Sequence, residues 1–167
     1  TLFPSLAMEL SIWYEGAFRT QSGPYGYSTA TSPAGDRELV AGSHLFWEQA
    51  LLAYTFPTSQ QSFYLSLTAG TSLNPDRLNT YRLGSLLPMV SEFPLALPGY
   101  FYQEISAKQF VLLGGNYIAP LDKNYRWNLT AIATGAVVDY LDGLEQPGNV
   151  HGGVGGGLLY KGRSVKV

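Results

Sequence analysis

The stretch MELSIWYEGAF, residues 8–18, constrains the fold more than any other part of the chain, because its side chains alternate in polarity. One set of alternate positions is apolar apart from a glycine, and comprises Met8, Leu10, Ile12, Tyr14, Gly16 and Phe18. The other set contains two carboxylates, Glu9 and Glu15. Successive side chains of a β-strand point to opposite faces of a sheet, so this pattern predicts a strand with one apolar and one polar face. The alternation alone does not identify the solvent on each side.

Composition narrows the choice of solvent. Charged residues make up 13% of the 167 residues, about half the share usual in soluble proteins, whereas hydrophobic residues reach 46% and aromatic residues 14%. No apolar run approaches the length of a membrane-spanning helix. The net charge of −2 gives no sign of a nucleic-acid partner. Low charge, many tyrosines and alternating strands favour an outer-membrane β-barrel over a secreted β-sandwich or a lipocalin-like barrel.

Turn signals divide the chain into seven strand-like segments, and short turns alternate with long loops, as in up-and-down barrels. The segments are 7–20, 37–55, 62–70, 78–84, 109–121, 127–140 and 151–160, and residues 161–167 lead toward an eighth strand. The connection 85–106 contains three prolines and is apolar, which is uncommon for a long loop in water. The start at Thr1 and the tail GRSVKV predict a segment of a longer protein, truncated at both ends.

Candidate catalytic residues are sparse. The chain has two histidines, and His44 lies four residues before Glu48, so both can point to one face of a strand. A pair without a third ligand or a nucleophile is weak support for a metal or general-base site, and we interpret it as a polar pair facing a barrel lumen. His151 is predicted to be a loop-rim residue. The motif G-x-S-x-G is absent and GGVGGG lacks the lysine of a phosphate loop, so we expect no enzyme, metal or cofactor.

Five short motifs in the second half of the chain point to a family. They are YRLGS at 81–85, LPGY at 97–100, NYIAPL at 116–121, VVDY at 137–140 and GVGGGLLYKGRS at 153–164. In order and spacing they resemble the carboxy-terminal part of the BamA/TamA-type superfamily of outer-membrane assembly and transport barrels. Two-partner-secretion transporters and barrels fused to patatin-like lipases are among its relatives. The resemblance covers about half the chain, and residues 1–76 match only in being strands.

The resemblance implies an antiparallel transmembrane β-barrel of about sixteen strands, of which this chain is a segment of about seven from the carboxy-terminal half. Residues 1–167 are then part of one barrel domain, and residues 85–106 form a loop that folds into the lumen. Its motif comprises Leu97, Pro98, Gly99 and Tyr100. Met8, Leu10 and Ile12 are predicted to face lipid, and Glu9, Glu15 and Arg19 to face the lumen.

The family pairs an arginine of that loop with a strand aspartate, and here the arginine position holds Pro98. Asp139 therefore lacks the partner that the resemblance implies. Arg82 or the Tyr100 hydroxyl can replace the arginine as the partner of Asp139, and solvation of Asp139 by water is the alternative. Glu104 is a further polar group assigned to the lumen. A lumen position for Asp139 places Trp127, Leu129 and Val137 in the lumen too. Residues 127–133 fit the opposite orientation equally well unless a bulge intervenes.

The implied function is insertion or translocation of polypeptides into or across a bacterial outer membrane, with the lumen loop as a gate or brace. Implied partners are outer-membrane lipids or lipopolysaccharide and client polypeptides, with no nucleic acid. Two alternatives remain open. One is a barrel that anchors a patatin-like lipase. The other is a soluble ligand-binding barrel, which predicts a polar exterior on the segments 7–20 and 62–70.

Overall fold

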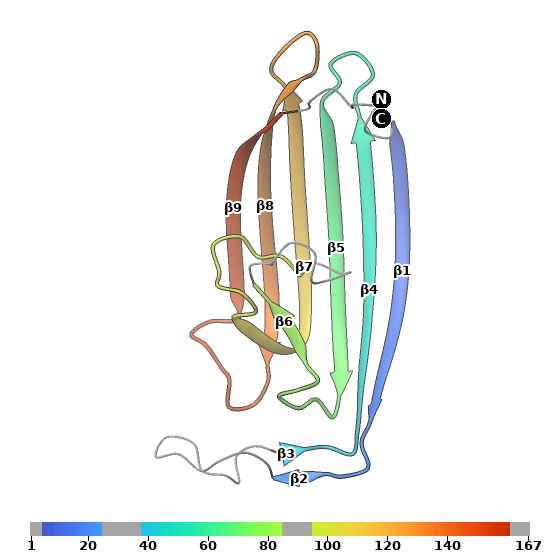
Figure 1. Ribbon diagram of the computed structural model, residues 1–167, viewed down its shortest axis with the longest axis vertical. Coiled ribbons are helices and arrows are strands. Elements are labelled where there is room, and N and C mark those ends of the chain that lie inside the picture. The colour runs from blue at the N-terminus through green and yellow to red at the C-terminus, as the bar shows by residue number, and fades with distance from the viewer. Residues whose placement is uncertain (1–4, 25–37, 85–94, 161–167) are drawn as a thin grey trace, which may run out of the picture.

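The computed structural model describes residues 5–24, 38–84 and 95–160, and a large antiparallel sheet dominates this part of the chain (Figure 1). The strands are β1 (Leu6–Phe18), β2 (Gly23–Pro24), β3 (Glu38–Leu39), β4 (Gly42–Thr55), β5 (Ser62–Leu73), β6 (Tyr81–Leu83), β7 (Ile105–Pro120), β8 (Trp127–Tyr140) and β9 (Val150–Tyr160). The sheet order is β1-β4-β5-β7-β8-β9, β6 pairs with the start of β7, and β2 and β3 form a separate pair. The predicted all-β, antiparallel fold is confirmed.

The short and the long connections between strands lie at opposite ends of the sheet. Residues 56–61 and 121–126 join strands at one end of the sheet, which we name the turn end. The opposite end, which we name the loop end, carries the described parts of the long connections, residues 19–24, 38–41, 74–84, 95–104 and 141–149. Among the described residues, no helix is both long enough and apolar enough to span a membrane. β1 and β9 form the two edges, and neither has a second strand partner within the described residues.

Three predicted segments differ from the strands in the structure. The segment 78–84 is not a full strand, because β6 has three residues and β5 pairs directly with β7. The segment 37–55 is divided into β3 and β4, and β7 begins at Ile105 rather than at 109. The predicted strands 62–70, 127–140 and 151–160 lie within or coincide with β5, β8 and β9. Residues 161–167, the predicted start of an eighth strand, lie outside the described residues.

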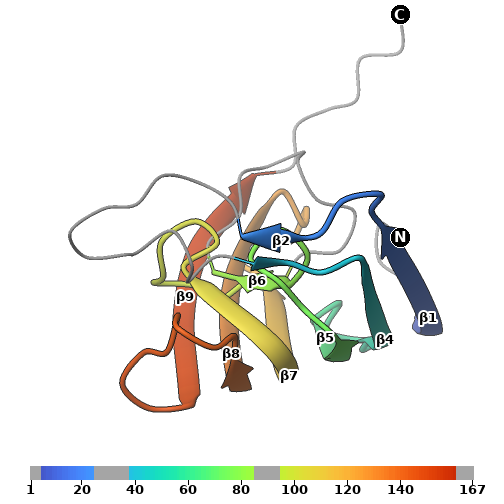
Figure 2. The same cartoon turned by 90° about the horizontal axis from the view of Figure 1, so that it is seen from below.

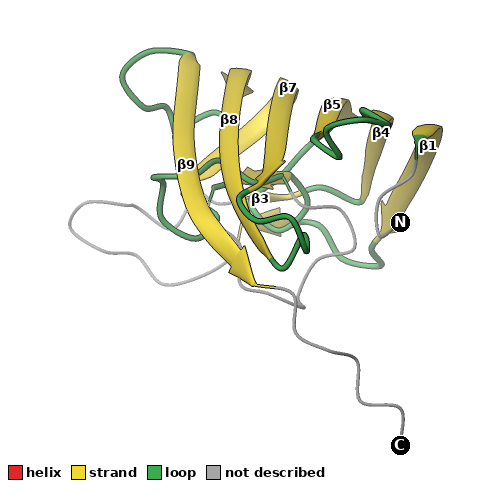
Figure 3. Ribbon diagram, turned by 90° about the horizontal axis from the view of Figure 1, so that it is seen from above, coloured by secondary structure: helices red, strands yellow, loops and turns green. Residues whose placement is uncertain are grey.

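Strand register assigns every side chain to one of two faces, because residues directly opposite one another in an antiparallel pair share a face. The open face carries the apolar set of β1, and one of its rows comprises Leu10, Ala50, Leu67, Leu113, Gly135 and Gly152. The covered face carries Glu9 and Glu15 on β1 and, further along the sheet, the residues on which β6 and residues 95–104 pack. The sheet is curved, and β6 lies on its concave side when it is viewed along the strands (Figures 2 and 3).

The hydrophobic core lies on the covered face near the loop end. Leu83, Leu97 and Ile105 are fully buried there, and the rest of the cluster comprises Leu45, Tyr81, Ala107, Phe110, Leu112, Ala136, Val138 and Tyr140. Tyr81 carries a polar group into this cluster, and its hydroxyl donates hydrogen bonds to the carbonyl oxygens of Phe46 (2.7 Å) and Thr71 (2.9 Å). Burial raises the pKa of Tyr81 to about 12, so the phenol is neutral at physiological pH. The core therefore packs β6 and residues 95–104 against β7 and β8.

Candidate functional site

The open face is apolar over most of its area, and its large side chains are exposed. The exposed fraction is 84% for Met8, 50% for Leu113 and 82% for Val154. Apolar side chains from all six long strands contribute to this surface, among them Leu52, Leu67, Val111, Leu129, Val137, Val150 and Leu158. Monomeric soluble proteins rarely expose contiguous apolar patches larger than a few hundred Å². This surface is therefore suited to an apolar surrounding medium or partner.

Aromatic side chains border the open face at the turn end. Tyr54, Phe63, Tyr117, Trp127 and Tyr160 come from five successive strands and lie at or near the strand termini of that end. Their register also places them on the open face, and Trp127 contacts Tyr160 with ring centroids 4.7 Å apart. Tyrosine and tryptophan combine an apolar ring with a polar group, so they suit a boundary between an apolar layer and water.

Polar side chains border the same face toward the loop end. His44, Glu48, Thr71, Gln109 and Asp139 form this polar border, and most of them line a hollow of about 540 Å³ together with apolar residues such as Ile12 and Val137. The prediction that His44 and Glu48 face the polar side of the sheet is wrong, because β4 pairs Glu48 with Ile12 of the open face. The polarity of β4 alternates poorly, so only its pairing with β1 fixes its orientation. His44 contacts the Tyr14 hydroxyl through Nδ1 at 2.9 Å.

Asp139 also lies on the open face, which corrects its predicted place beside Glu9 and Glu15. β8 pairs with β7 without interruption from Asn128 to Asp139, and the bulge is on β7 at Lys108 rather than within β8. Asp139 is paired with Gln109, and its side chain is 61% exposed. Its carboxylate forms an ion pair with Lys108, with Nζ 3.8 Å from Oδ2.

Arg82 and Glu104, the polar groups that the sequence assigns to the lumen with Asp139, make other contacts. Arg82 donates to the Ser106 hydroxyl (2.6 Å) and to the Arg77 carbonyl oxygen (2.7 Å). These bonds hold β6 in place, and Arg82 is not a partner of Asp139. Glu104 accepts a hydrogen bond from the Phe101 amide at 2.7 Å and stabilises a turn in its own segment.

Residues 95–104 belong to the connection that the sequence predicts to fold inward, and they pack on the covered face. Residues 85–94 of that connection lie outside the described residues. Leu97 has no exposed surface, and its amide donates to the Gly84 carbonyl oxygen at 3.0 Å. The carbonyl oxygen of Pro98 approaches β9 so closely that a Cβ atom at Gly153 would overlap it. Gly99 adopts a φ of 93°, which an L-residue rarely adopts, so a glycine suits this turn.

Tyr100 contacts His151 instead of Asp139, with its hydroxyl 3.1 Å from Nδ1. The Nε2 atom of His151 lies 2.5 Å from the Tyr140 hydroxyl, which donates to the Gly148 carbonyl oxygen at 2.6 Å. His151 is therefore a buried side chain between two tyrosines rather than a loop-rim residue. Sequence reasoning missed this group, since residues 100, 140 and 151 share no motif.

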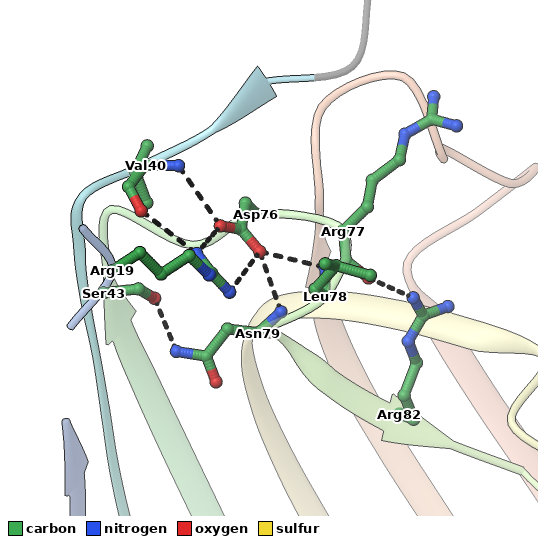
Figure 4. A network of polar contacts seen from close by, with 8 residues as sticks. All are labelled: Arg19, Val40, Ser43, Asp76, Arg77, Leu78, Asn79 and Arg82. Atoms are coloured by element: carbon green, nitrogen blue, oxygen red, sulfur yellow. Dashed lines mark hydrogen bonds and ion pairs between the residues drawn. The ribbon is translucent and has the colours of Figure 1, made fainter. Parts of the chain in front are cut away.

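An ion pair joins three segments at the loop end (Figure 4). Asp76, whose side chain is 2% exposed, pairs with Arg19, and its carboxylate accepts hydrogen bonds from the amides of Leu78 (2.9 Å), Asn79 (2.9 Å) and Val40 (3.3 Å). Burial acts to raise the pKa of Asp76, but these amides and the Arg19 guanidinium outweigh burial and hold the pKa below its usual range. Arg19, a predicted lumen residue, thus fixes the loop end.

The described residues contain no cluster of three or more histidine, cysteine, aspartate or glutamate side chains that could hold a metal ion. A comparison of the chain with protein-family models, curated proteins and solved structures found no match.

Proposed function

We propose that this chain is part of a bacterial outer-membrane β-barrel, with the open face toward lipid and the covered face toward the barrel interior. The observation that carries the proposal is the contrast between the two faces. The open face presents Met8, Leu67 and Leu113 with no described segment packed over them. Toward the turn end the covered face mixes polar side chains, such as Asn116 and Thr130, with apolar ones such as Ile132. Transmembrane barrels need this combination of an apolar exterior and a polar interior.

The dimensions of the apolar band support the proposal. On β5 the aromatic Phe63 and the polar Thr71 are eight positions apart, and on β7 Tyr117 and Gln109 are the same number of positions apart. At about 3.4 Å per residue these spans measure about 27 Å along the strand. A strand tilted by about 40° would cross about 20 Å, close to the apolar height of about 25 Å in such barrels. The aromatic border at the turn end corresponds to one of the two interfacial girdles.

For the activity, we propose insertion or translocation of polypeptides, with residues 95–104 as the gate or brace. The five motifs that resemble the BamA/TamA-type superfamily support this activity, and so does the position of LPGY on the covered face. Lipid or lipopolysaccharide would contact the open face, and a client polypeptide would meet the polar face or an unpaired sheet edge. No catalytic group is required of the described residues.

Two adjacent residues of β5 test the lipid assignment. Leu67→Lys places a charge on the open face near the middle of the apolar band, and Ser66→Lys places the same charge on the covered face. A lysine at the midplane of a bilayer costs about 2–4 kcal/mol, so only Leu67→Lys is expected to reduce folding into lipid vesicles. Equal stabilities of the two variants, or a chain that is monomeric in buffer without detergent, would refute the proposal in favour of a soluble barrel.

Fluorescence offers an independent measurement, because Trp127 lies on the open face and Trp13 on the covered face. In single-tryptophan variants, lipids with brominated acyl chains should quench Trp127 more strongly than Trp13. The activity itself is tested with the full-length protein in liposomes and a urea-unfolded eight-stranded barrel as the client. Faster insertion than into empty liposomes is expected. Equal rates would remove the assembly role and leave the lipid assignment intact.

A further inference from the structure

The contacts of His151 define a directed chain of hydrogen bonds. The single hydroxyl hydrogen of Tyr140 is directed at the Gly148 carbonyl oxygen, 2.6 Å away. The Tyr140 oxygen can therefore only accept from His151, which places a hydrogen on Nε2. A neutral imidazole with Nε2–H has an unprotonated Nδ1, and this atom accepts from the Tyr100 hydroxyl. The chain thus selects one tautomer of His151 and links residues 95–104 to β8 and β9.

Backbone packing provides a second, independent contact between the same partners. The Pro98 carbonyl oxygen lies over Gly153 on β9, where any β-carbon would displace it. Gly155, the next residue of β9 on the covered face, has open space at the same position, with no atom within 4 Å of an added Cβ. Close backbone approach is a common reason for a glycine within a strand. Residues 95–104 therefore fit the sheet at one defined place.

Beneath the segment lies an apolar surface. Leu97 packs in the cluster that contains Phe110, Leu112, Ala136 and Val138. The segment itself has large exposed side chains on its other side, with Phe101 at 83% and Tyr102 at 44%. Its hydrogen bonds to other described segments lie at four places. Leu95 and Leu97 bond with the backbone of Gly84, Tyr100 bonds with His151, and the Glu104 carbonyl oxygen accepts from Gln146. This arrangement suits a segment that docks and undocks as a unit.

We propose that His151 is a positioning residue that, with Gly153, holds residues 95–104 docked as a detachable cover over the apolar part of the covered face. Undocking breaks the Tyr100–His151 bond and exposes Phe110, Leu112 and Val138 to the interior. An apolar strip that is uncovered in this way offers a transient surface to an extended apolar segment of a client polypeptide. This last step rests on the proposed function, whereas the docking equilibrium does not.

Hydrogen exchange of the purified chain in detergent micelles tests the cover. Tyr100→Phe removes one hydroxyl and leaves Leu97 in place, so the amides of Leu97 and Tyr100 should exchange about fivefold faster, as expected from the loss of one hydrogen bond. Tyr102→Phe is the matched control, because the Tyr102 hydroxyl makes no hydrogen bond to another residue within the described ranges. It should leave the exchange rates unchanged. Nitrogen-15 NMR of His151 should show the Nε2–H tautomer in the unmodified chain.

A second pair of variants acts through the backbone and keeps every hydroxyl. Gly153→Ala should accelerate exchange of the same amides tenfold or more, whereas Gly155→Ala should not. Amides in the pairing of β8 with β9 serve as the internal reference and should keep their rates. Unchanged exchange at Leu97 and Tyr100 in both Tyr100→Phe and Gly153→Ala would overturn the inference. Equal acceleration across β8 and β9 would also overturn it, because the variants would then loosen the sheet rather than release a cover.

The two proposals can fail separately. Leu67→Lys and Ser66→Lys report on the surroundings of the open face and do not touch residues 95–104. If the two lysine variants fold into lipid equally well while Gly153→Ala and Gly155→Ala differ in hydrogen exchange, the cover is supported and the lipid assignment is refuted. The opposite outcome leaves a lipid-embedded sheet whose inner segment is permanently fixed.

Discussion

Replacing Asp76 by alanine is the strongest single test of what holds the loop end together. The carboxylate is buried and accepts from three backbone amides and the Arg19 guanidinium, and its contacts come from the chain after β1, before β4 and between β5 and β6. Removal of one partner of a buried ion pair typically costs 3–5 kcal/mol, because the other charge and the amides lose their partner. We expect Asp76→Ala to lower the free energy of unfolding by about 3–5 kcal/mol.

Two further variants apportion this effect. Asp76→Asn keeps an oxygen for the amides of Leu78 and Asn79 but loses the charge, so a loss of about 1.5–3 kcal/mol is expected. In a double-mutant cycle with Arg19→Ala, the double variant should be more stable than the sum of the single effects predicts, by about 1–3 kcal/mol. Such a coupling energy would identify the ion pair itself as a source of stability.

The measurement is urea unfolding in detergent micelles, followed by tryptophan fluorescence. Asp122 is the matched control, because it also accepts from two turn amides, Asn124 (3.2 Å) and Trp127 (2.8 Å), but at an exposed site of the turn end. Asp122→Ala should cost about 1 kcal/mol or less. If Asp76→Ala were no more destabilising than Asp122→Ala, the buried network would not be the element that fixes the loop end.

Three other predictions follow from the same contacts. The pKa of Asp76 is lower in the folded state, so its contribution to stability is complete above about pH 4, the unfolded value, and is lost as the pH falls through the lower native pKa. As the pH is lowered, the free energy of unfolding should therefore fall less steeply in Asp76→Asn than in the unmodified chain. Tyr81→Phe should lower the free energy of unfolding by about 1–2 kcal/mol. Between pH 10 and about 12 the phenol ionises in the unfolded chain but stays protonated in the native one, so the unmodified chain loses stability as the pH rises. Tyr81→Phe should lose less stability over the same range. Gly70→Ala should cost about 1–3 kcal/mol, since its Cβ would lie 2.5 Å from a ring carbon of Phe110, whereas Gly115→Ala, where the nearest atom is 3.9 Å away, should be tolerated.

The sequence predicted correctly those strands whose polarity alternates clearly, and it misplaced strands whose pattern is weaker. The clean alternation of residues 8–18 gave the correct two faces of β1, and the segment 127–140 coincides with β8. The strand predicted at 78–84 was too long, because the segment has strand composition but only Tyr81–Leu83 forms a strand. Local composition reports the propensity to be extended and does not report whether a neighbouring strand is within reach.

The site residues show a similar division. The resemblance singled out residues 97–100 and offered Asp139 as a partner of Tyr100, whereas the structure pairs Tyr100 with His151. The orientation of Asp139 depends on an uninterrupted register between β7 and β8, which no pattern within residues 127–140 could establish. Likewise, Arg19 pairs with Asp76, which is distant in sequence. Charged residues usually lie at the surface, so nothing in the sequence indicated that these two form a buried ion pair.

The amino-acid sequence by itself determined that this chain forms strands and that β1 and β5 separate apolar from polar side chains, because side-chain alternation is a local consequence of the extended backbone. Only the tertiary structure decided which face β4 and β8 present, where residues 95–104 dock, and which charges become buried. Those outcomes depend on strand register and on segments far apart along the chain. A shift of one residue in register inverts every side chain of a strand, so the pairing of whole strands, rather than any single motif, fixed the surfaces from which the function is proposed.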